Sequence, residues 1–330
     1  MTTQPPKVTV VVPSYNHGAY IGQRLESILN QTYRDFELVV IDDRSPDHSD
    51  DVIRSYLDSH QFRYIRNEKN SGTPFAAWEY AARTARGTYL WICESDDVAD
   101  PQFLSVAVPA MDANPDAALF YTDSWIIDAK GERIDSTDSY FHDIWQESRW
   151  DADFKADGLQ ELKHFQLRGQ TVPNMSSALI RTDAFRAAYT PILKRFRLCG
   201  DWVFIGLVML QGAVLFRNEA LSHFRRHEST ARVRVKSALS QAEFVLTKYL
   251  LYRAGGYPPR DFAHAVRLDG IRFIYEPASA WDVVKAMLSV SPVKTIGAGL
   301  MLAYSLAHHR DYVARYRARR RQQALAARGS

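Results

Sequence analysis

The order of hydrophobic and polar residues predicts alternating strands and helices from residue 7 to about residue 122. Residues 8–12 form a continuous β-branched run, which is typical of a strand buried on both faces. The residues after this run place Ile21, Leu25, Ile28 and Leu29 on one face of a helix. By the same criteria, further strands are expected at 36–41, 62–65, 88–93 and 117–121, and further helices at 47–57, 74–85 and from Pro101. This alternation implies right-handed crossovers, so we predict an α/β fold with a mostly parallel sheet flanked by helices.

The alternation loosens beyond residue 124 and stops near Val235. Weaker signals in between resemble two strands, one helix and one basic loop, at 175–180, 213–216, 201–210 and 223–234 respectively. From residue 237 onward the hydrophobic period is helical. We therefore expect an α/β domain over residues 1–235 and a helical C-terminal region over residues 236–330.

Polar residues stand where three of the predicted strands end. Residues 13–16 (Pro-Ser-Tyr-Asn) follow the first strand, Asp42 and Asp43 end the second, and residues 94–97 (Glu-Ser-Asp-Asp) end the fourth. In an open parallel sheet, ligands bind at the carboxyl ends of the strands. We therefore expect these three polar groups to face one crevice.

Glu94, Asp96 and Asp97 are the strongest indication of chemistry in the chain. Three carboxylates within four residues repel one another unless a cation offsets their charge. Mg²⁺ and Mn²⁺ prefer such oxygen ligands and complete their shells with waters and substrate phosphates. The alternative is a solvated acidic turn with Asp97 or Asp100 capping the next helix, but a cap accounts for one acid rather than three. We therefore predict a site for Mn²⁺ or Mg²⁺ at this turn.

The groups at the first two strand ends have ordinary structural interpretations beside the functional ones. Residues 13–16 are either a turn or a place where the ring of Tyr15 holds a base. Asp42 and Asp43 either cap the next helix or accept hydrogen bonds from a nucleobase or ribose. A glycine-rich dinucleotide fingerprint and a phosphate-binding P-loop are both missing from the sequence, which argues against a standard Rossmann cofactor site.

Two groups later in the chain are open to the same pair of interpretations. Asp201 precedes an apolar helix and, taken alone, is most simply an N-cap. Arg226 and His227 belong to a basic loop that is either solvated or lies beside a pyrophosphate, where histidine can also be a metal ligand.

Composition narrows the class of protein. The 330 residues are 46% hydrophobic and 24% charged, which is ordinary for a globular protein. No run of about 18 uncharged apolar residues predicts a membrane-spanning helix, and the run at residues 8–12 is too short for a signal peptide. The only two cysteines, Cys93 and Cys199, adjoin apolar runs, so we expect buried free thiols and a cytoplasmic location.

Charge is concentrated at the C-terminal end. The net charge is +3, but residues 310–330 contain seven arginines and one acid and carry +6, which leaves 3 − 6 = −3 for the rest. Residues 281–308 before this tail are apolar, and they are either helices packed on the α/β domain or a segment that lies on an anionic membrane surface. The second interpretation places the protein at the inner face of the membrane. No nucleic-acid recognition fold accompanies the tail, so nucleic-acid binding is not expected.

Taken together and in this order, several segments resemble the family 2 glycosyltransferases of the GT-A fold. The resemblance covers roughly residues 7–230. It rests on the segments 8–16, 31–33 (Gln-Thr-Tyr), 36–43, 70–72 (Asn-Ser-Gly), 85–87 (Ala-Arg-Gly), 94–97 and 200–201 (Gly-Asp). It implies a GT-A type, Rossmann-like sheet to which the helical C-terminal region is an extension.

The resemblance also implies roles for the matching residues. Those implied in nucleotide binding, with the base most often uracil, are Pro13, Tyr15, Asn16, Asp42, Asp43, Asn70, Gly72 and Asp96. Asp96 and Asp97 fall on the family's Asp-x-Asp region, which contacts ribose and the metal that bridges the two phosphates. Glu94 stands where the commoner pattern has aspartate, so the implied metal ligands are Asp97, Asp96 and Glu94.

The remaining implied roles concern catalysis. Asp201 falls on the position of the general base, and because Gly200 replaces an acid often found there, Asp201 is the only local candidate. Arg226 and His227 would contact the diphosphate or the metal.

The implied activity is an inverting transfer of sugar from a nucleotide-diphosphate sugar, expected to be a UDP-sugar, to a hydroxyl group. The acceptor would be a glycan or a lipid-linked molecule in bacterial surface polysaccharide synthesis, such as that of lipopolysaccharide and the cell envelope. Two alternatives are a catalytically silent sugar-nucleotide binding or scaffold protein, and a nucleotidyltransferase. The latter normally has a glycine-rich basic loop near the first strand, which residues 14–18 match poorly.

Overall fold

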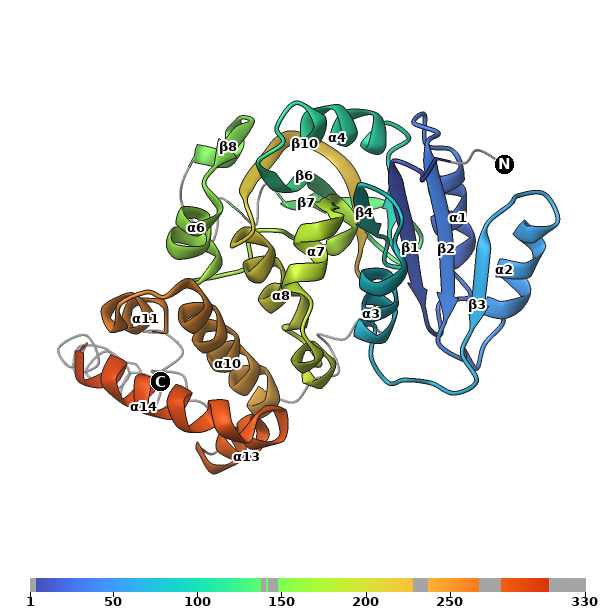
Figure 1. The fold of residues 1–330 in the computed structure, drawn as a ribbon. Helices are drawn as coiled ribbons and strands as arrows, with labels where there is room; N and C mark the ends of the chain where they lie inside the picture. Colours follow the sequence, from blue (N-terminus) through green and yellow to red (C-terminus); the bar gives the residue numbers. More distant parts are fainter. Residues whose placement is uncertain (1–3, 138–140, 142–147, 228–236, 267–279, 309–330) are drawn as a thin grey trace, which may run out of the picture.

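The computed structural model describes residues 4–137, 141, 148–227, 237–266 and 280–308, and its central feature is a ten-stranded sheet with helices on both faces (Figure 1). The strands are β1 (Val8–Ser14), β2 (Phe36–Asp42), β3 (Arg63–Arg66), β4 (Tyr89–Ile92), β5 (Val98–Ala99), β6 (Ala117–Ile127), β7 (Arg133–Ser136), β8 (Phe154–Ala156), β9 (Ala178–Arg181) and β10 (Ala213–Arg225). Their order across the sheet is β3-β2-β1-β4-β9-β6-β10-β5, with β7 beside β6 and β8 beside β10.

Most of the sheet runs in one direction. β1 is parallel to β2 and β4, β2 to β3, and β6 to β10. β9 is antiparallel to both β4 and β6, so these two point the same way. Six strands (β3, β2, β1, β4, β6 and β10) therefore bring their carboxyl ends to one edge, and the predicted α/β fold with a mostly parallel sheet is confirmed.

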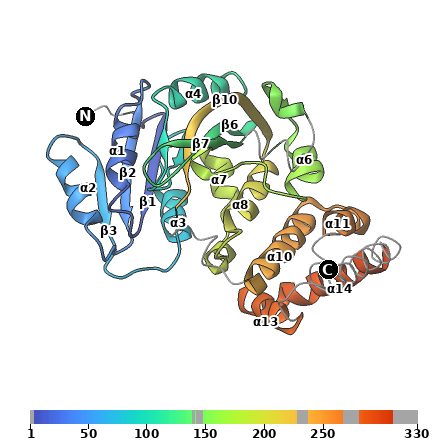
Figure 2. The same ribbon diagram turned by 180° about the vertical axis from the view of Figure 1, so that it is seen from behind.

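Helices cover the sheet on both faces. The helices of the described residues are α1 (Ile21–Leu29), α2 (Ser49–Leu57), α3 (Phe75–Thr84), α4 (Phe103–Asp112), α6 (Gly158–Glu161), α7 (Thr182–Ala188), α8 (Gly200–Met209), α10 (Ser237–Gly255), α11 (Pro259–Ala265), α13 (Ala280–Val290) and α14 (Pro292–His308). Helices α3, α7 and α8 lie on one face of the sheet, and α1, α2 and α4 lie on the other (Figures 1 and 2).

The first strand shows why the pattern of residues produces this layering. All seven of its residues are buried, and their side chains alternate between the two faces. Val8, Val10 and Val12 pack with Ile21 of α1, whereas Val11 faces the cluster that contains Trp78 of α3. Burial of each such valine contributes about 1.5–3 kcal/mol, which holds β1 at the centre of the sheet.

The C-terminal helices pack on the same hydrophobic core. Leu251 of α10 contacts Gly206 of α8 so closely that a side chain at Gly206 would collide with it. One cluster of buried side chains continues from the sheet through α8 and α10 to Val283 of α13 and Leu302 of α14. The division of the chain at residue 235 remains a prediction, and the two parts share this core.

Several element boundaries differ from the prediction because pairing partners extend them. The strand expected at 213–216 is the much longer β10, which pairs with β6 as far as Arg225 opposite Ile127. The basic loop expected from residue 223 therefore starts only after Arg225, and its residues 228–236 lie outside the described part of the chain. The strand expected at 175–180 begins with a short 3₁₀ turn, in which the side chain of Asn174 accepts a hydrogen bond from the backbone N–H of Ser177.

The structure bears on two expectations from composition, one about the cysteines and one about membrane-spanning helices. Both cysteines are buried free thiols, as predicted. Within the described ranges, no helix is both long enough and apolar enough to cross a membrane. The arginine-rich segment 310–330 lies outside these ranges.

Candidate active site

The turn after β1 brings an unexpected residue to the carboxyl edge of the sheet. Asn16 adopts a left-handed backbone conformation with φ 57°, and its N–H donates to Ser45 Oγ at 3.0 Å. The chain then reverses, and the carbonyl of His17 accepts the first hydrogen bond of α1, from Ile21. His17 is thereby directed at the turn that follows β4, where its Nδ1 lies 2.7 Å from Ser95 Oγ.

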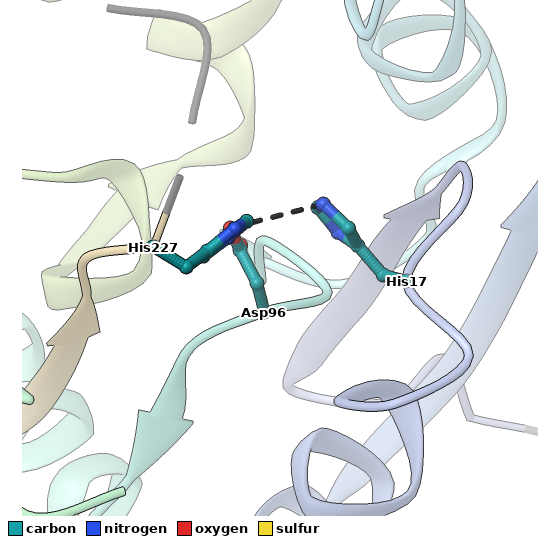
Figure 3. Close-up of side chains that lie close together, drawn as sticks. All are labelled: His17, Asp96 and His227. Atoms are coloured by element: carbon teal, nitrogen blue, oxygen red, sulfur yellow. Dashed lines mark hydrogen bonds and ion pairs between the residues drawn. The ribbon is translucent and has the colours of Figure 1, made fainter. Parts of the chain in front are cut away.

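Three side chains converge at this edge from three elements far apart in sequence (Figure 3). His227 Nε2 lies 3.0 Å from Asp96 Oδ2, and His17 Nε2 lies 3.9 Å from the same oxygen. One nitrogen or oxygen of each residue lies within 4.8 Å of the others, so the three side chains could hold a metal ion together. We refer to His17, Asp96 and His227 as the His–Asp–His cluster.

The surroundings favour the protonation states that ligands of a metal need. Burial alone would raise the pKa of Asp96, but its hydrogen bond with His227 and the charge of His17 hold that pKa below its usual value. Burial lowers the pKa of His17. A metal ion binds ionised carboxylates and neutral imidazoles, so both shifts are in the right direction.

Asp97 points away from this cluster into the protein. Its side chain is almost fully buried and accepts hydrogen bonds from Ser176 Oγ at 2.6 Å and the backbone N–H of Arg225 at 2.9 Å. The guanidinium of Arg24, itself buried, lies 3.9 Å away. Burial, followed by the charge of Asp96, raises the pKa of Asp97 to about 7. The structure therefore separates two neighbouring acids: Asp96 faces the histidines, and Asp97 anchors the turn.

Glu94 is the first residue of the acidic turn and is half-buried. Burial raises the pKa of its carboxyl to about 8, and the charges of Asp96, Asp97 and Asp201 add to this effect. Asp201 is thus close enough to act electrostatically on the acidic turn.

Arg225 connects the acidic turn with residues near the start of α1. It was not selected as a site residue from the sequence. Its guanidinium donates to the carbonyl of Asp96 at 2.6 Å and to Gln23 Oε1 at 2.7 Å, and it lies 4.9 Å from the ring centroid of Tyr20. The neighbouring Arg226, which was predicted, is exposed beside His227. The long β10 ends at Arg225, and Arg226 and His227 follow it directly.

The ends of β1 and β2 lie side by side, as their parallel pairing requires. Ser14 is paired with Asp42, and the N–H of Asp43 donates to the carbonyl of Ser14 at 2.8 Å. Pro13 is buried in β1, whereas the ring of Tyr15 is 45% exposed and available to stack on a ligand.

The two aspartates at the end of β2 have different surroundings. Asp42 is buried, and its carboxylate accepts hydrogen bonds from Ser45 and from Arg66 Nε at 3.1 Å. Asp43 is half-buried and accepts from Asn67 Nδ2 at 2.7 Å and from the N–H of Ser71 at 3.0 Å. Asp43 therefore organises the loop that contains the predicted residues.

In that loop, Asn70 and Gly72 form a tight turn. The side chain of Asn70 accepts a hydrogen bond from the N–H of Gly72, which adopts φ 76°. The carbonyl of Gly72 accepts from Arg197, which lies in the segment before α8. The loop after β3 and the approach to Asp201 are thus connected directly.

Asp201 lies in the first turn of α8. Its Oδ2 accepts a hydrogen bond from Gln170 Nε2 at 3.0 Å, and its Oδ1 accepts from the N–H of Trp202 at 2.8 Å. Gln170 comes from the region whose sequence carried no clear signal. The residue before Asp201 is glycine for a packing reason, since a Cβ at Gly200 would lie 2.3 Å from Cζ of Phe75.

Replacing Gly200 by alanine should therefore destabilise the protein. The added methyl group meets the ring of Phe75, which is itself held against Trp78 with 4.9 Å between ring centroids. Overpacking of this kind costs about 1–3 kcal/mol, measurable as a lower free energy of unfolding in urea. Gly299→Ala in α14 is the matched control, because no atom lies within 4 Å of its added Cβ. Equal stability of the two variants would show that the ring of Phe75 moves aside freely.

The segment that leads to Asp201 is held by a carboxylate from the C-terminal helices. Glu243 of α10 is fully buried. It accepts hydrogen bonds from the backbone N–H groups of Arg197 at 2.7 Å, Leu198 at 2.8 Å and Cys199 at 2.9 Å. The C-terminal helices thus contribute a positioning residue to the site of the α/β domain.

Glu243→Gln should lower both stability and turnover. The amide has one acceptor oxygen for three N–H groups, and loss of charge-assisted hydrogen bonds costs about 2 kcal/mol here. The three residues it releases lead directly to Asp201, so kcat should fall at temperatures where the variant is fully folded. The control is Glu79→Gln, whose partly exposed ion pair with Lys194 contributes little. If urea unfolding changes and kcat does not, Glu243 serves stability alone.

Comparison with known proteins relates part of the chain to a family of enzymes. The family model for Glycosyl transferase family 2 matches residues 9–168. Chondroitin synthase of Escherichia coli is 32% identical over 130 residues, which is 39% of this chain and 19% of that protein. Poly(ribitol-phosphate) beta-glucosyltransferase of Bacillus spizizenii is 35% identical over 94 residues, which is 28% of this chain and 15% of that protein. The chain spans less than half the length of each curated relative described here.

Similar folds are found among solved structures. TarS 1–349 of S. aureus, in complex with UDP-GlcNAc, aligns with a TM-score of 0.65 and 17% identity over 91% of this chain and 87% of that chain. The mannosyltransferase PcManGT of Pyrobaculum calidifontis, in complex with GDP-Man and Mn²⁺, aligns with a TM-score of 0.54 and 17% identity over 94% of this chain and 84% of that chain. The likeness to these GT-A proteins concerns the fold. Residues 9–168, just under half of the chain, match the family model, and this region belongs to glycosyltransferase family 2.

Proposed function

We propose that the protein is an inverting, metal-dependent glycosyltransferase that transfers a sugar from a UDP-sugar to a hydroxyl group of a glycan or lipid-linked acceptor. The observation that carries the proposal is the His–Asp–His cluster at the carboxyl ends of β1 and β4, with Asp201 near enough to influence the same acidic turn. A nucleotide diphosphate, a cation and a general base are what this reaction requires, and the site has a candidate for each.

The residues present fit a divalent metal ion. Asp96, His227 and His17 converge within ligand distance of one another, and the contact between His17 Nδ1 and Ser95 leaves Nε2 directed at Asp96. Two imidazoles and one carboxylate suit Mn²⁺ better than Mg²⁺, which prefers oxygen ligands alone. Bound there, the metal would act as a Lewis acid on the departing diphosphate. In this arrangement the predicted ligands Glu94 and Asp97 would not contact the metal, and they would instead stabilise the turn that carries Asp96.

The nucleotide is expected along the ends of β1 and β2. Tyr15 offers an exposed ring on which a base can stack, and Asp43 lies beside it at the strand end. The turn of Asn70 and Gly72, ordered through Asp43, would border the ribose. Arg226 is exposed next to the cluster, where its charge would attract the diphosphate.

Asp201 is proposed as the general base. As the acceptor oxygen attacks the anomeric carbon, its proton passes to the carboxylate of Asp201, which Gln170 holds in place. The bond between the anomeric carbon and the diphosphate oxygen breaks, and its electron pair leaves with the diphosphate. Attack from the side opposite the leaving group inverts the configuration at that carbon.

The proteins described above support a UDP-sugar as the donor and a glycan as the acceptor. TarS has been solved with UDP and with UDP-GlcNAc, which favours a uridine nucleotide here. PcManGT binds GDP-Man with Mn²⁺, which supports a metal-dependent nucleotide sugar. By their names, chondroitin synthase and poly(ribitol-phosphate) beta-glucosyltransferase act on polymers, which supports a glycan acceptor and a role in surface polysaccharide synthesis.

The test is calorimetric titration of the protein with UDP, dTDP and GDP, each with and without Mn²⁺. Tight binding of UDP that requires Mn²⁺ supports the proposal, and hydrolysis or transfer from UDP-sugars then shows turnover. Metal-dependent binding without turnover on any donor would point to a sugar-nucleotide binding or scaffold protein. Absence of metal-dependent binding to all three nucleotides would overturn the proposed site.

A further inference from the structure

The last described helix exposes apolar side chains on its outer side. Val293 is 79% exposed, Ile296 and Leu300 are each 69% exposed, and Tyr304 is 42% exposed. These residues follow the spacing of one helical face. Trp281 and Leu288 of α13 are also exposed, at 61% and 40%. We refer to these six residues as the C-terminal apolar face.

The inner side of α14 shows that this exposure is built into the helix. Its buried residues include Thr295 and Ser305, whose hydroxyls donate to the carbonyls of Ser291 and Ala263. Ala298 and Leu302 are the other buried residues of this side. The helix thus buries two hydroxyls, an alanine and one leucine, and it exposes four large apolar side chains, whereas a water-facing helix exposes polar ones. Such a helix is suited to an apolar environment on its outer side.

The two helices that carry the C-terminal apolar face lie at the periphery of the protein. α13 and α14 pack on α10 and on each other, and they lie at the outer edge of the molecule in both views (Figures 1 and 2). Among the described residues, six of the nine large exposed hydrophobic side chains belong to α13 and α14. Their concentration in one place distinguishes them from the isolated apolar residues found on most surfaces.

Positive charge accompanies the apolar face. Lys285 and Lys294 are exposed on these helices, and the Lys285 amine lies 5.5 Å from the ring centroid of Trp281. Asp282 is the only acid in residues 280–308. The chain continues directly into the tail with its seven arginines: Arg310, Arg315, Arg317, Arg319, Arg320, Arg321 and Arg328. Apolar groups with tryptophan and basic residues at their border are typical of a helix that lies in the headgroup region of a membrane.

We propose that the C-terminal apolar face lies on the surface of a bilayer that contains anionic phospholipids. The apolar side chains would enter the boundary between headgroups and acyl chains, while the lysines and the arginine-rich tail contact phosphates. Because no described helix is long and apolar enough to cross a membrane, α14 would lie in the plane of the surface. This inference does not depend on the proposed transferase activity.

A second copy of the chain is a poorer partner for this face. A symmetric dimer places the same surface patch of both copies in contact. Pairing through α14 would bring together two segments that are each followed by a tail of charge +6, and like charges at an interface oppose association. An anionic lipid surface instead complements both the apolar side chains and the charge.

The experiment is flotation of the full-length protein with vesicles of phosphatidylcholine, with and without phosphatidylglycerol. The protein should float with the anionic vesicles, and high salt should weaken this binding without abolishing it. The double variant Ile296→Ser/Leu300→Ser should bind these vesicles at least tenfold less, since each inserted side chain changes partitioning by about tenfold. Arg319→Gln/Arg320→Gln/Arg321→Gln halves the charge of the tail, from +6 to +3, and should weaken binding and reduce its salt dependence.

The matched control is Ile134→Ser in β7, which removes another exposed isoleucine, at 58% exposure, far along the chain from α14. It should float like the wild type. Circular dichroism and nucleotide titration check that each variant is folded. Unchanged flotation of Ile296→Ser/Leu300→Ser would overturn the proposal. So would a wild-type dimer in sedimentation velocity that this double variant abolishes, because the face would then bind a second copy.

Discussion

Asp201→Asn should reduce kcat by about 10²–10⁴-fold while leaving the affinity for UDP and Mn²⁺ unchanged. Asparagine has nearly the size of aspartate, so the carbonyl oxygen of its amide can still accept the hydrogen bond from Gln170, which is 3.0 Å long in the wild type. The amide does not take up a proton at neutral pH. The acceptor hydroxyl would then have to attack without losing its proton, and the barrier to transfer rises.

The measurement compares steady-state transfer with calorimetric binding of UDP, in the presence of Mn²⁺, for the same preparations. Asp183→Asn is the matched control, because this aspartate also lies in the first turn of a helix, α7, but its side chain is 89% exposed. It should leave kcat unchanged. Gln170→Ala should lower kcat less than Asp201→Asn does, since it only frees the orientation of the base. A comparable loss of nucleotide binding and turnover in Asp201→Asn would assign Asp201 to the nucleotide site instead.

The order of layers could be predicted from the sequence because hydrophobic burial determines it locally. The valines of β1 are buried on both faces, and such a strand appears in the sequence as an uninterrupted apolar run. The length of β10 could not be predicted in this way. Its residues Asn218 and Glu219 interrupt the apolar pattern, and pairing with β6 carries the strand on to Arg225. The length of β10 therefore depends on hydrogen bonding to β6, a strand distant in sequence, and the local hydrophobic pattern contains no record of that pairing.

The candidate site shows the same division between local and distant information. The positions of Asp43 and Asp96 at strand ends allowed us to predict the edge of the sheet on which they lie, because the carboxyl ends of parallel strands share an edge. The sequence offered no means of separating Asp96 from Asp97. Their different orientations follow from Ser176 and the backbone of Arg225, which hold Asp97 inside the protein.

His17 and Glu243 were missed for related reasons. A single histidine after a turn has no sequence spacing that marks it as a metal ligand. His17 can be recognised as a candidate ligand only in the structure, where Asp96 and His227 lie beside it. The one available signal was its position three residues after β1, at a strand end already considered functional. Glu243 lies within a helical pattern and acts through three backbone groups of a distant segment, a role that no sequence motif describes.

Asp96→Ala and His227→Ala should each abolish the dependence of UDP binding on Mn²⁺. Asp96 Oδ2 lies between the two imidazoles, 3.0 Å from His227 and 3.9 Å from His17, so its removal leaves two neutral ligands and no compensating negative charge. Loss of a ligand from such a site is expected to weaken metal binding by at least about 10²-fold, because an adjoining residue that merely orients a ligand already accounts for 10–100-fold. Titration of Mn²⁺ followed by electron paramagnetic resonance measures this directly, and chelation by EDTA should make wild type and variants alike in UDP affinity.

Comparison with Asp97→Asn separates the two acids that the sequence could not distinguish. If the cluster is the metal site, Asp97→Asn should lower the free energy of unfolding, because the amide serves its two hydrogen-bond donors less well, yet leave Mn²⁺ affinity nearly intact. His17→Gln should weaken Mn²⁺ binding if the imidazole of His17 is a ligand, whereas His60→Gln, at an exposed histidine near Tyr56, should not. Retention of Mn²⁺ binding in Asp96→Ala, together with its loss in Asp97→Asn, would move the metal to the buried carboxylate. The inward orientation of Asp97 would then have to change on binding, and Arg225 would have to release it.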